Sequence, residues 1–189
     1  SKIRDNINKD IAQAKNSTFA NHRYWLGFGV GAAGVATNND AFFQWGIESA
    51  RVGLREVQPD GSLPREMNRA SRARDYHIFA VAPLVMMAEL GMANGINLYD
   101  ETDGALHKLV KRILASDRDT SFYERRTGKK QIPYPDGNDG IPSSRLGWLE
   151  PYYARFPSQE ALSILKNKRS VSSTALGGNM TLIYTGKDE

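Results

Sequence analysis

Residues 59–77 read PDGSLPREMNRASRARDYH, and the chain then runs apolar to Leu90. Pro59-Asp60-Gly61 is a turn, because Pro presets φ, Asp bonds its own backbone and Gly adopts positive φ. From Ala73 onward, residues recur at the three- and four-residue steps of a helix: Ala73, Tyr76, Ala80, Pro83, Leu84, Met87 and Leu90. A helix this apolar is buried. The arginines, Tyr76 and His77 at its start are therefore expected at the edge of a core, where a cleft can form.

The remaining sequence predicts further helices around this one. Apolar residues fall on one helical face in residues 1–15, 41–57, 104–115 and 159–167, and residues 145–156 also indicate a helix. Residues 26–35 are rich in Gly and Ala, and since each Gly costs a helix about 1 kcal/mol, tertiary packing must hold this segment. Asn38-Asn39-Asp40 is a turn and helix N-cap. Because no alternating strand series occurs, the fold class is all-α, in a single domain over residues 1–189.

The less regular segments give weaker predictions. Residues 117–144, with several Pro and Asp-Gly pairs, are expected to be loop. Two basic pairs in this loop could face a polyanion or only solvent. Residues 180–184 could be a short helix or a strand, and His107 is expected on the surface of its helix.

Composition narrows the class of partner. The 189 residues carry a net charge of +4 and no cysteine, which excludes disulfides and thiolate chemistry. No apolar run approaches the roughly 20 residues of a membrane helix, so no membrane partner is expected. A pI near 9.3 favours a polyanion, either nucleic acid or an acidic polysaccharide. Without a known nucleic-acid-binding motif, a helical nucleic-acid binder is the weaker hypothesis.

Most catalytic constellations are missing from the sequence. The three histidines have no metal-ligand spacing, and neither a phosphate loop nor a serine nucleophile elbow occurs. The carboxylates Glu66 and Asp75 are flanked by arginines and are interpreted as their ion-pair partners. For Asn21 and His22, a helix cap with a satisfied histidine is the structural interpretation. The functional one is a sugar-acid site, since Tyr24 and Trp25 stand beside amide, imidazole and guanidinium donors.

The remaining candidates suit β-elimination in a uronic acid polymer. They are the neutral and cationic groups Asn21, His22, Arg69 and Tyr76. An arginine and an amide can neutralise the substrate carboxylate and stabilise the enolate-like charge that develops when the C5 proton leaves. A nearby Tyr or His accepts that proton. On a continuous helix, Arg69 and Tyr76 would share one face two turns apart.

Several motifs give the chain a resemblance to a known family. They are Asn21-His22-x-Tyr24-Trp25, Asp60-Gly61-x-Leu63-Pro64-x-Glu66, Arg69-x-x-Arg72-Ala73-x-x-Tyr76-His77, Phe79-Ala80-x-Ala82-Pro83-Leu84-Val85, Gly104-Ala105-Leu106-His107, Trp148-Leu149-Glu150-Pro151-Tyr152 and Leu176-Gly177-Gly178. Together they resemble the mannuronate-specific alginate lyases of polysaccharide lyase family 5. The motifs occur in order over nearly the whole chain.

The resemblance implies an incomplete α/α toroid and endolytic cleavage of polymannuronate in the periplasm, without a metal or other cofactor. Asn21, His22 and Arg69 would neutralise the carboxylate, and Tyr76 would act as base and then as acid. Tyr24, Trp25, Arg72 and His77 are expected to bind the acidic polysaccharide around them.

The sequence also departs from the family pattern. Arg23, Arg74-Asp75 and Ile78 differ from the usual residues and could retune the site toward another polyuronate. The chain matches the C-terminal half or so of family members, without their N-terminal helices and lid. It is therefore expected to be a fragment of a longer protein, or to pair with the missing segment or another copy of itself. A non-catalytic fragment that binds a uronate polymer is the alternative function.

Overall fold

The computed structural model of the protein describes residues 5, 9, 20–134 and 140–186. The predicted helix over residues 1–15 lies outside the described part, apart from Asp5 and Lys9. The helices are α2 (Ala20–Ala36), α3 (Asp40–Glu56), α4 (Pro64–Met67), η1 (Ala70–Arg72), α5 (Ala73–Ala93), α6 (Glu101–Leu114), α7 (Ser121–Thr127), η2 (Ser143–Arg145), α8 (Leu149–Arg155), α9 (Gln159–Lys166), η3 (Thr174–Leu176) and α10 (Met180–Thr185). Two strands of two residues each, β1 (Ser172–Ser173) and β2 (Gly178–Asn179), pair in an antiparallel arrangement. The all-α prediction is confirmed.

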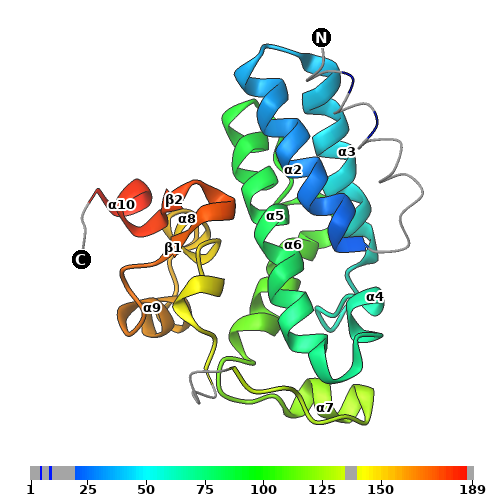
Figure 1. Ribbon diagram of the computed structural model, residues 1–189, viewed down its shortest axis with the longest axis vertical. Coiled ribbons are helices and arrows are strands. Elements are labelled where there is room, and N and C mark those ends of the chain that lie inside the picture. The colour runs from blue at the N-terminus through cyan, green and yellow to red at the C-terminus, as the bar shows by residue number, and fades with distance from the viewer. Residues whose placement is uncertain (1–4, 6–8, 10–19, 135–139, 187–189) are drawn as a thin grey trace.

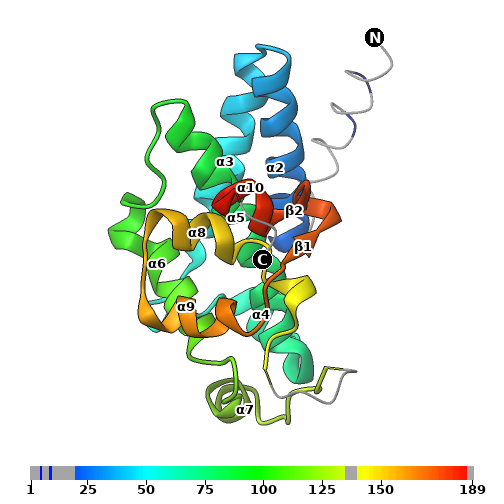
Figure 2. The same cartoon turned by 90° about the vertical axis from the view of Figure 1, so that its left-hand side faces the viewer.

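Helix α5 is the centre of the structure. Figure 1 shows it running through the middle of the body, with α2 and α3 beside its upper half and a smaller C-terminal lobe, α8 to α10, on one side. Figure 2 shows the same lobe packed across the face of α5 and α6. Residues 70–93 form a segment long and apolar enough to cross a membrane, but 67% of its most apolar 18-residue stretch is buried inside the protein. Helix α5 is thus a core helix, as its apolar sequence predicts.

Helices α2 and α3 pack with their backbones almost in contact. A Cβ atom on Gly46 of α3 would lie 2.7 Å from the carbonyl oxygen of Gly27 and 2.8 Å from the Cα of Gly31, both in α2. Since these neighbours are backbone atoms, they cannot move aside as a flexible side chain can. The glycines that weaken α2 as an isolated helix therefore create its closest tertiary contact, as the sequence predicts.

The predicted boundaries hold for several helices and fail for others. Asn39 caps α3 by accepting a hydrogen bond from the backbone N–H of Phe42, as expected. The segment 117–144 was expected to be loop, but it contains α7. A seven-residue helix is too short to show apolar periodicity. This one is held by Tyr123, which is fully buried, and by Phe122, whose ring lies 3.7 Å from the Arg112 guanidinium carbon.

The prediction that His107 lies on the surface is wrong. His107 is half-buried because the C-terminal lobe covers its face of α6. Its ring stacks on Tyr99 at a centroid distance of 5.6 Å, and its Nδ1 lies 2.7 Å from the hydroxyl of Tyr152 in α8. Burial lowers the pKa of His107. The residue thus joins α6 to the lobe.

His77 connects the start of α5 to the turn before α4. The backbone N–H of Leu63 donates to its Nε2 at 2.8 Å, so the ring proton resides on Nδ1, which donates to the carbonyl of Ala73 at 2.7 Å. The side chain is completely buried, and this burial lowers its pKa to about 4. A neutral histidine therefore holds the loop and the helix in register.

We predict that substituting Gly46 by Ala lowers the free energy of unfolding by about 1 to 3 kcal/mol, because the added methyl group overpacks the α2–α3 contact. Gly29, also in α2, is the matched control: no atom lies within 4 Å of its added Cβ. Gly29→Ala should leave stability unchanged or raise it by up to about 1 kcal/mol. Urea denaturation measures both, and equal effects of the two substitutions would contradict the close approach.

We predict that His77 makes the fold sensitive to mild acid. Its pKa rises from about 4 in the folded protein to about 6.5 in the unfolded chain, so the unfolded state takes up the proton first. The contribution of neutral His77 to the free energy of unfolding is complete above pH ~6.5. It is lost as the pH falls toward ~4, by roughly 3 kcal/mol in total. Urea denaturation at a series of pH values should show a flatter pH dependence for His77→Gln than for the wild type. The same pH dependence in the His77→Gln variant and the wild type would contradict this role of His77.

Candidate active site

A buried carboxylate lies at the centre of the predicted site. Glu66 in α4 is 1% exposed. The amide nitrogen of Asn21 in α2 lies 3.0 Å from both of its oxygens, and Arg69 Nε lies 3.8 Å from Oε2. Burial raises the pKa of Glu66, and the Asn21 hydrogen bond and the Arg69 charge oppose that rise. Glu66 is thus an ion-pair partner, as predicted, and it also ties α4 to the first turn of α2.

Arg69 and Tyr76 lie together, but by a different route from the predicted one. The chain between them is not a continuous helix, because Ala70 has φ of +53° and α5 begins at Ala73. The expectation of one shared helical face is therefore wrong. The break instead folds Arg69 back, so that its guanidinium carbon lies 4.4 Å from the centroid of the Tyr76 ring.

Gln131 holds this break in place. Its side-chain amide donates to the carbonyl of Ala70 at 3.0 Å and accepts from the backbone N–H of Arg74 at 3.0 Å. The backbone N–H of Ile132 donates to the carbonyl of Ser71 at 2.8 Å. A left-handed conformation at a residue other than glycine is costly. These bonds offset that cost and fix the position of Arg69.

The other candidates occupy two kinds of position. His22 is exposed and follows Asn21 at the start of α2, while Arg72 is exposed in η1. Trp25 is half-buried, and its indole nitrogen donates to the carbonyl of Phe79 at 3.1 Å. The ring of Phe79 in turn lies 5.0 Å from Trp25 and 6.5 Å from Tyr76. Phe79 therefore links the Tyr76 side of α5 to the aromatic platform predicted at Trp25.

Two expected substrate-binding residues are instead part of the core. Tyr24 is 1% exposed, and its hydroxyl donates to Glu56 at 3.1 Å. His77 is fully buried with both ring nitrogens engaged. Neither presents a polar atom to a ligand, so we revise their role from binding substrate to supporting the site. Sequence could not show this, because an aromatic residue beside a cleft and one beneath it have the same neighbours along the chain.

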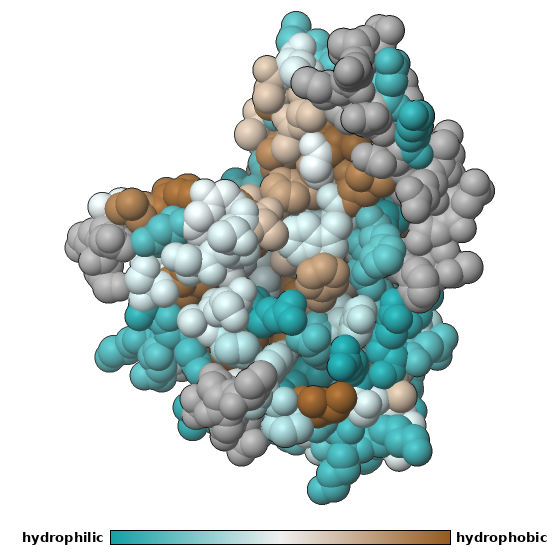
Figure 3. Space-filling model, in the orientation of Figure 1, coloured by the Kyte–Doolittle hydropathy of each residue, from teal (hydrophilic) through white to brown (hydrophobic). Residues whose placement is uncertain are grey.

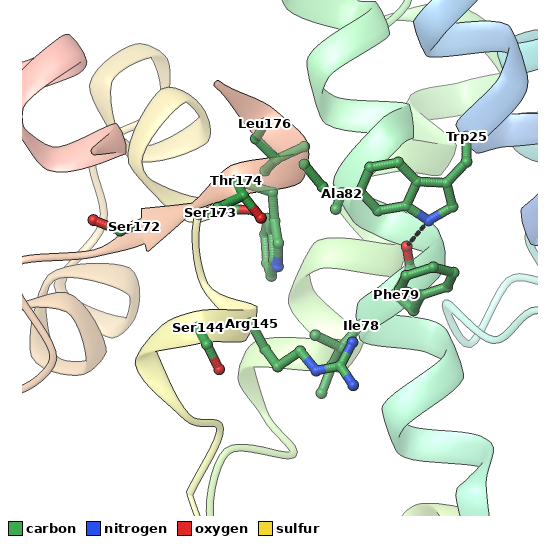
Figure 4. A pocket seen from close by; sticks show the side chains of 13 residues that line it. Trp25, Ile78, Phe79, Ala82, Ser144, Arg145, Ser172, Ser173, Thr174 and Leu176 are labelled. Carbon is green, nitrogen blue, oxygen red and sulfur yellow. Dashed lines mark hydrogen bonds between the residues drawn. The ribbon is translucent and has the colours of Figure 1, made fainter. Parts of the chain in front are cut away.

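A cleft of about 560 Å³ opens beside these residues, between the body and the C-terminal lobe. Trp25, Ile78, Phe79 and Ala82 form one wall, and the lobe contributes the other. Figure 4 shows Trp25 and Phe79 on α2 and α5 facing the segment 172–176 across the opening. Of the predicted site residues, Trp25 lines the cleft directly, and Phe79 connects it to Tyr76.

Arg145 is a site residue that sequence reasoning missed. It lies in η2 and reaches across the cleft toward α5 (Figure 4). Its Nη2 is 3.5 Å from Asp75 Oδ1, and its guanidinium carbon is 6.0 Å from the Phe79 ring. Tyr134 also donates to Asp75, at 3.4 Å. Asp75 thus pairs with a distant arginine rather than with its sequence neighbours, and no local pattern signals such a contact.

Comparisons with known proteins agree with the motifs. The alginate lyase family profile matches residues 3–122, well over half of the chain. The chain is 35% identical to an alginate lyase of Pseudomonas syringae pv. syringae (strain B728a), over 100% of this chain and 49% of that protein. It is 38% identical to a polysaccharide lyase of Stenotrophomonas maltophilia (strain K279a), over 87% of this chain and 47% of that protein. The chain therefore spans about half the length of these curated relatives.

The structure is also similar to solved alginate lyases. It matches alginate lyase A1-III from Sphingomonas species A1 with a TM-score of 0.77 and 26% identity, over 89% of this chain and 48% of that one. A variant of A1-III complexed with a tetrasaccharide matches with a TM-score of 0.75 and 27% identity, over 87% and 47% of the two chains. These matches confirm the predicted incomplete α/α toroid. From its family profile and its structural likeness, the chain belongs to the alginate lyase family.

Proposed function

We propose that the protein is a polysaccharide lyase that cleaves alginate at mannuronate by β-elimination. The observation that carries the proposal is the contact between Arg69 and Tyr76, 4.4 Å from guanidinium carbon to ring centroid. A group that neutralises a carboxylate and a group that moves a proton must both reach one sugar. In this arrangement they lie side by side, next to a cleft with aromatic walls.

The proposed reaction needs only proton transfers and one bond cleavage. Tyr76 takes the proton from C5 of the mannuronate as the general base. The C4–C5 double bond forms as the C4–O bond to the preceding sugar breaks. The Tyr76 hydroxyl then returns its proton to the leaving glycosidic oxygen, so the residue serves as base and acid in turn.

The cations and amide act on the substrate carboxylate. Negative charge spreads from C5 onto this carboxylate in the transition state, so donors placed there stabilise the transition state more than the ground state. Arg69 supplies the positive charge, and the exposed His22 is the second donor. Asn21 is the third, by resemblance to the family. Its amide nitrogen is bonded to Glu66, so it must share that donation or turn to reach the sugar.

Glu66 gives this arrangement its rigidity. A buried carboxylate without partners is strongly unfavourable, so Glu66 holds Asn21 and Arg69 close to it. A guanidinium fixed in this way loses less conformational entropy when it binds a carboxylate. The proposal therefore assigns Glu66 a positioning role, without contact to the substrate.

The comparisons support the substrate class. The relatives are named alginate lyase or polysaccharide lyase, and one solved neighbour is complexed with a tetrasaccharide. Another polyuronate is the alternative substrate, since Asp75, the residue before Tyr76, and its partner Arg145 place an ion pair beside the candidate site. Binding of a uronate polymer without catalysis is the alternative function, and the chain spans about half the length of its relatives. We further propose that the protein acts in the periplasm.

The proposed activity predicts rising ultraviolet absorbance when polymannuronate is added to this chain, because each cleavage forms one unsaturated uronate. Polyguluronate and polyglucuronate serve as comparison substrates. A faster rate on either polymer would show that its sugar, and not mannuronate, is the preferred unit. No absorbance change with any of them, while the chain remains folded and binds polymannuronate, would favour the non-catalytic alternative.

We predict that Tyr76→Phe lowers turnover by at least about a thousandfold, since it removes both the base and the acid. Affinity for polymannuronate should change little, because the ring and its contact with Arg69 remain. The matched control is Tyr153→Phe, a half-buried tyrosine in α8. Near-normal turnover in Tyr76→Phe would remove Tyr76 from the mechanism.

A further inference from the structure

A group of basic side chains lies at one end of the molecule, outside the cleft. We call it the basic ledge and define it as Arg72, Arg125, Arg126, Lys129 and Lys130, all of which are exposed. Arg72 lies in η1, the next two residues are in the last turn of α7, and the lysines follow that helix. Figure 3 shows mostly hydrophilic side chains over this end of the molecule, around α4 and α7, with one small apolar patch among them, whereas more apolar side chains gather higher, over α2 and α5.

Few carboxylates oppose this charge. Residues 118–130 contain five cations and two acids, Asp119 and Glu124. Glu124 is half-buried and accepts hydrogen bonds from the Thr120 hydroxyl and the Gln131 backbone N–H. Asp119 accepts from the backbone N–H of Ser121. Arg126 pairs with Asp60 at 3.5 Å, but 54% of its side chain remains exposed. The ledge therefore has an excess of positive charge facing solvent.

The ledge is attached directly to the candidate active site. Gln131 donates from one amide nitrogen to the carbonyls of both Lys129, at 3.2 Å, and Ala70, at 3.0 Å. Ala70 is the residue after Arg69, and Ile132 is bonded to Ser71. The same contacts that position Arg69 thus hold the lysine loop beside it.

A line of arginines connects the ledge to the cleft. Arg145 lines the main cleft and also a second hollow of about 200 Å³ beside it. Arg72 and Arg74 line this second hollow, and Arg72 is itself part of the ledge. Arg74 is 2% exposed and Asp75, the partner of Arg145, also lines this hollow. An extended polyanion that leaves the cleft would therefore meet the exposed parts of Arg145 and then Arg72.

We propose that the basic ledge is a docking surface for the part of the polyuronate chain that extends beyond the cleft. The inference rests on the proposed function for the identity of the polyanion. Each exposed contact is weak, but several contacts to one chain add, and they raise the effective concentration of the polymer at the cleft. The ledge should therefore favour long chains over short oligomers and should lose its effect in high salt.

The test is a double variant, Lys129→Gln with Lys130→Gln. The hydrogen bonds that anchor this loop at Lys129 involve its backbone groups, so the substitution removes charge and keeps the fold. The control is Lys166→Gln with Lys168→Gln, a pair of lysines at the end of α9 in the C-terminal lobe. Calorimetric titration with long polymannuronate and with short mannuronate oligomers, over a series of salt concentrations, gives the affinities.

We expect the ledge variant to bind long polymannuronate about three- to tenfold more weakly than wild type at low salt. The slope of log affinity against log salt should fall by about one to two. The ledge variant should bind short oligomers as the wild type does. The control variant should bind both long polymannuronate and short oligomers as the wild type does. Equal affinities of the ledge variant and wild type for the long polymer would overturn the ledge, whether or not the chain turns substrate over.

The remaining outcomes separate this inference from the proposed function. A ledge effect on binding, without unsaturated product from the wild type, would overturn the lyase proposal and support the ledge as a polyanion dock. Failure of the wild type to bind polymannuronate would overturn both. Tighter, ledge-dependent binding of single-stranded DNA than of polymannuronate would assign the surface to nucleic acid and overturn the polyuronate proposal.

Discussion

The buried charge of Glu66 is the constraint on which the site depends. A carboxylate that is 1% exposed must be satisfied within the protein, and Asn21 and Arg69 provide its partners. This requirement brings together the first turn of α2, the short helix α4 and the residue before η1. Because the same two partners are candidates for recognising a substrate carboxylate, an internal anion organises the groups proposed to bind an external one. Burial raises the pKa of Glu66, and the contacts with Asn21 and Arg69 oppose that rise.

The break at Ala70 brings this local pairing next to Tyr76. A continuous helix would place Arg69 along α5, whereas the left-handed residue returns it onto the Tyr76 ring. The strain is held by Gln131, which bonds to both sides of the break. Since Gln131 also anchors the loop that carries Lys129 and Lys130, the site and the basic ledge share one support. A change in the backbone of this loop would therefore affect Arg69, whereas a change confined to the lysine side chains alters only the charge of the surface.

Two buried features support the same site: the glycine contact between α2 and α3, and the neutral His77. The close approach of α2 and α3 positions the helix that carries Asn21, His22 and Trp25. His77, the residue after Tyr76, bonds the start of α5 to the turn that leads into α4. Across the cleft, Arg145 and the C-terminal lobe complete the enclosure. The candidate site side chains are thus held by several packed elements rather than by one loop.

Sequence by itself determined the local features. The apolar periodicity of residues 41–57 and 104–115 predicted helices with the correct buried faces, and the apolar run after Tyr76 predicted the core helix. The motifs were sufficient to select the family, and they made Asn21, Arg69 and Tyr76 the candidate site residues. Tertiary structure decided what periodicity cannot encode. Tyr24 and His77 are buried beneath the site, Arg145 crosses from another lobe, and α7 forms where only a loop was expected. The physical reason is that burial and ion pairing depend on which surfaces meet, and residues such as Asp75 and Arg145 meet only after the helices have packed.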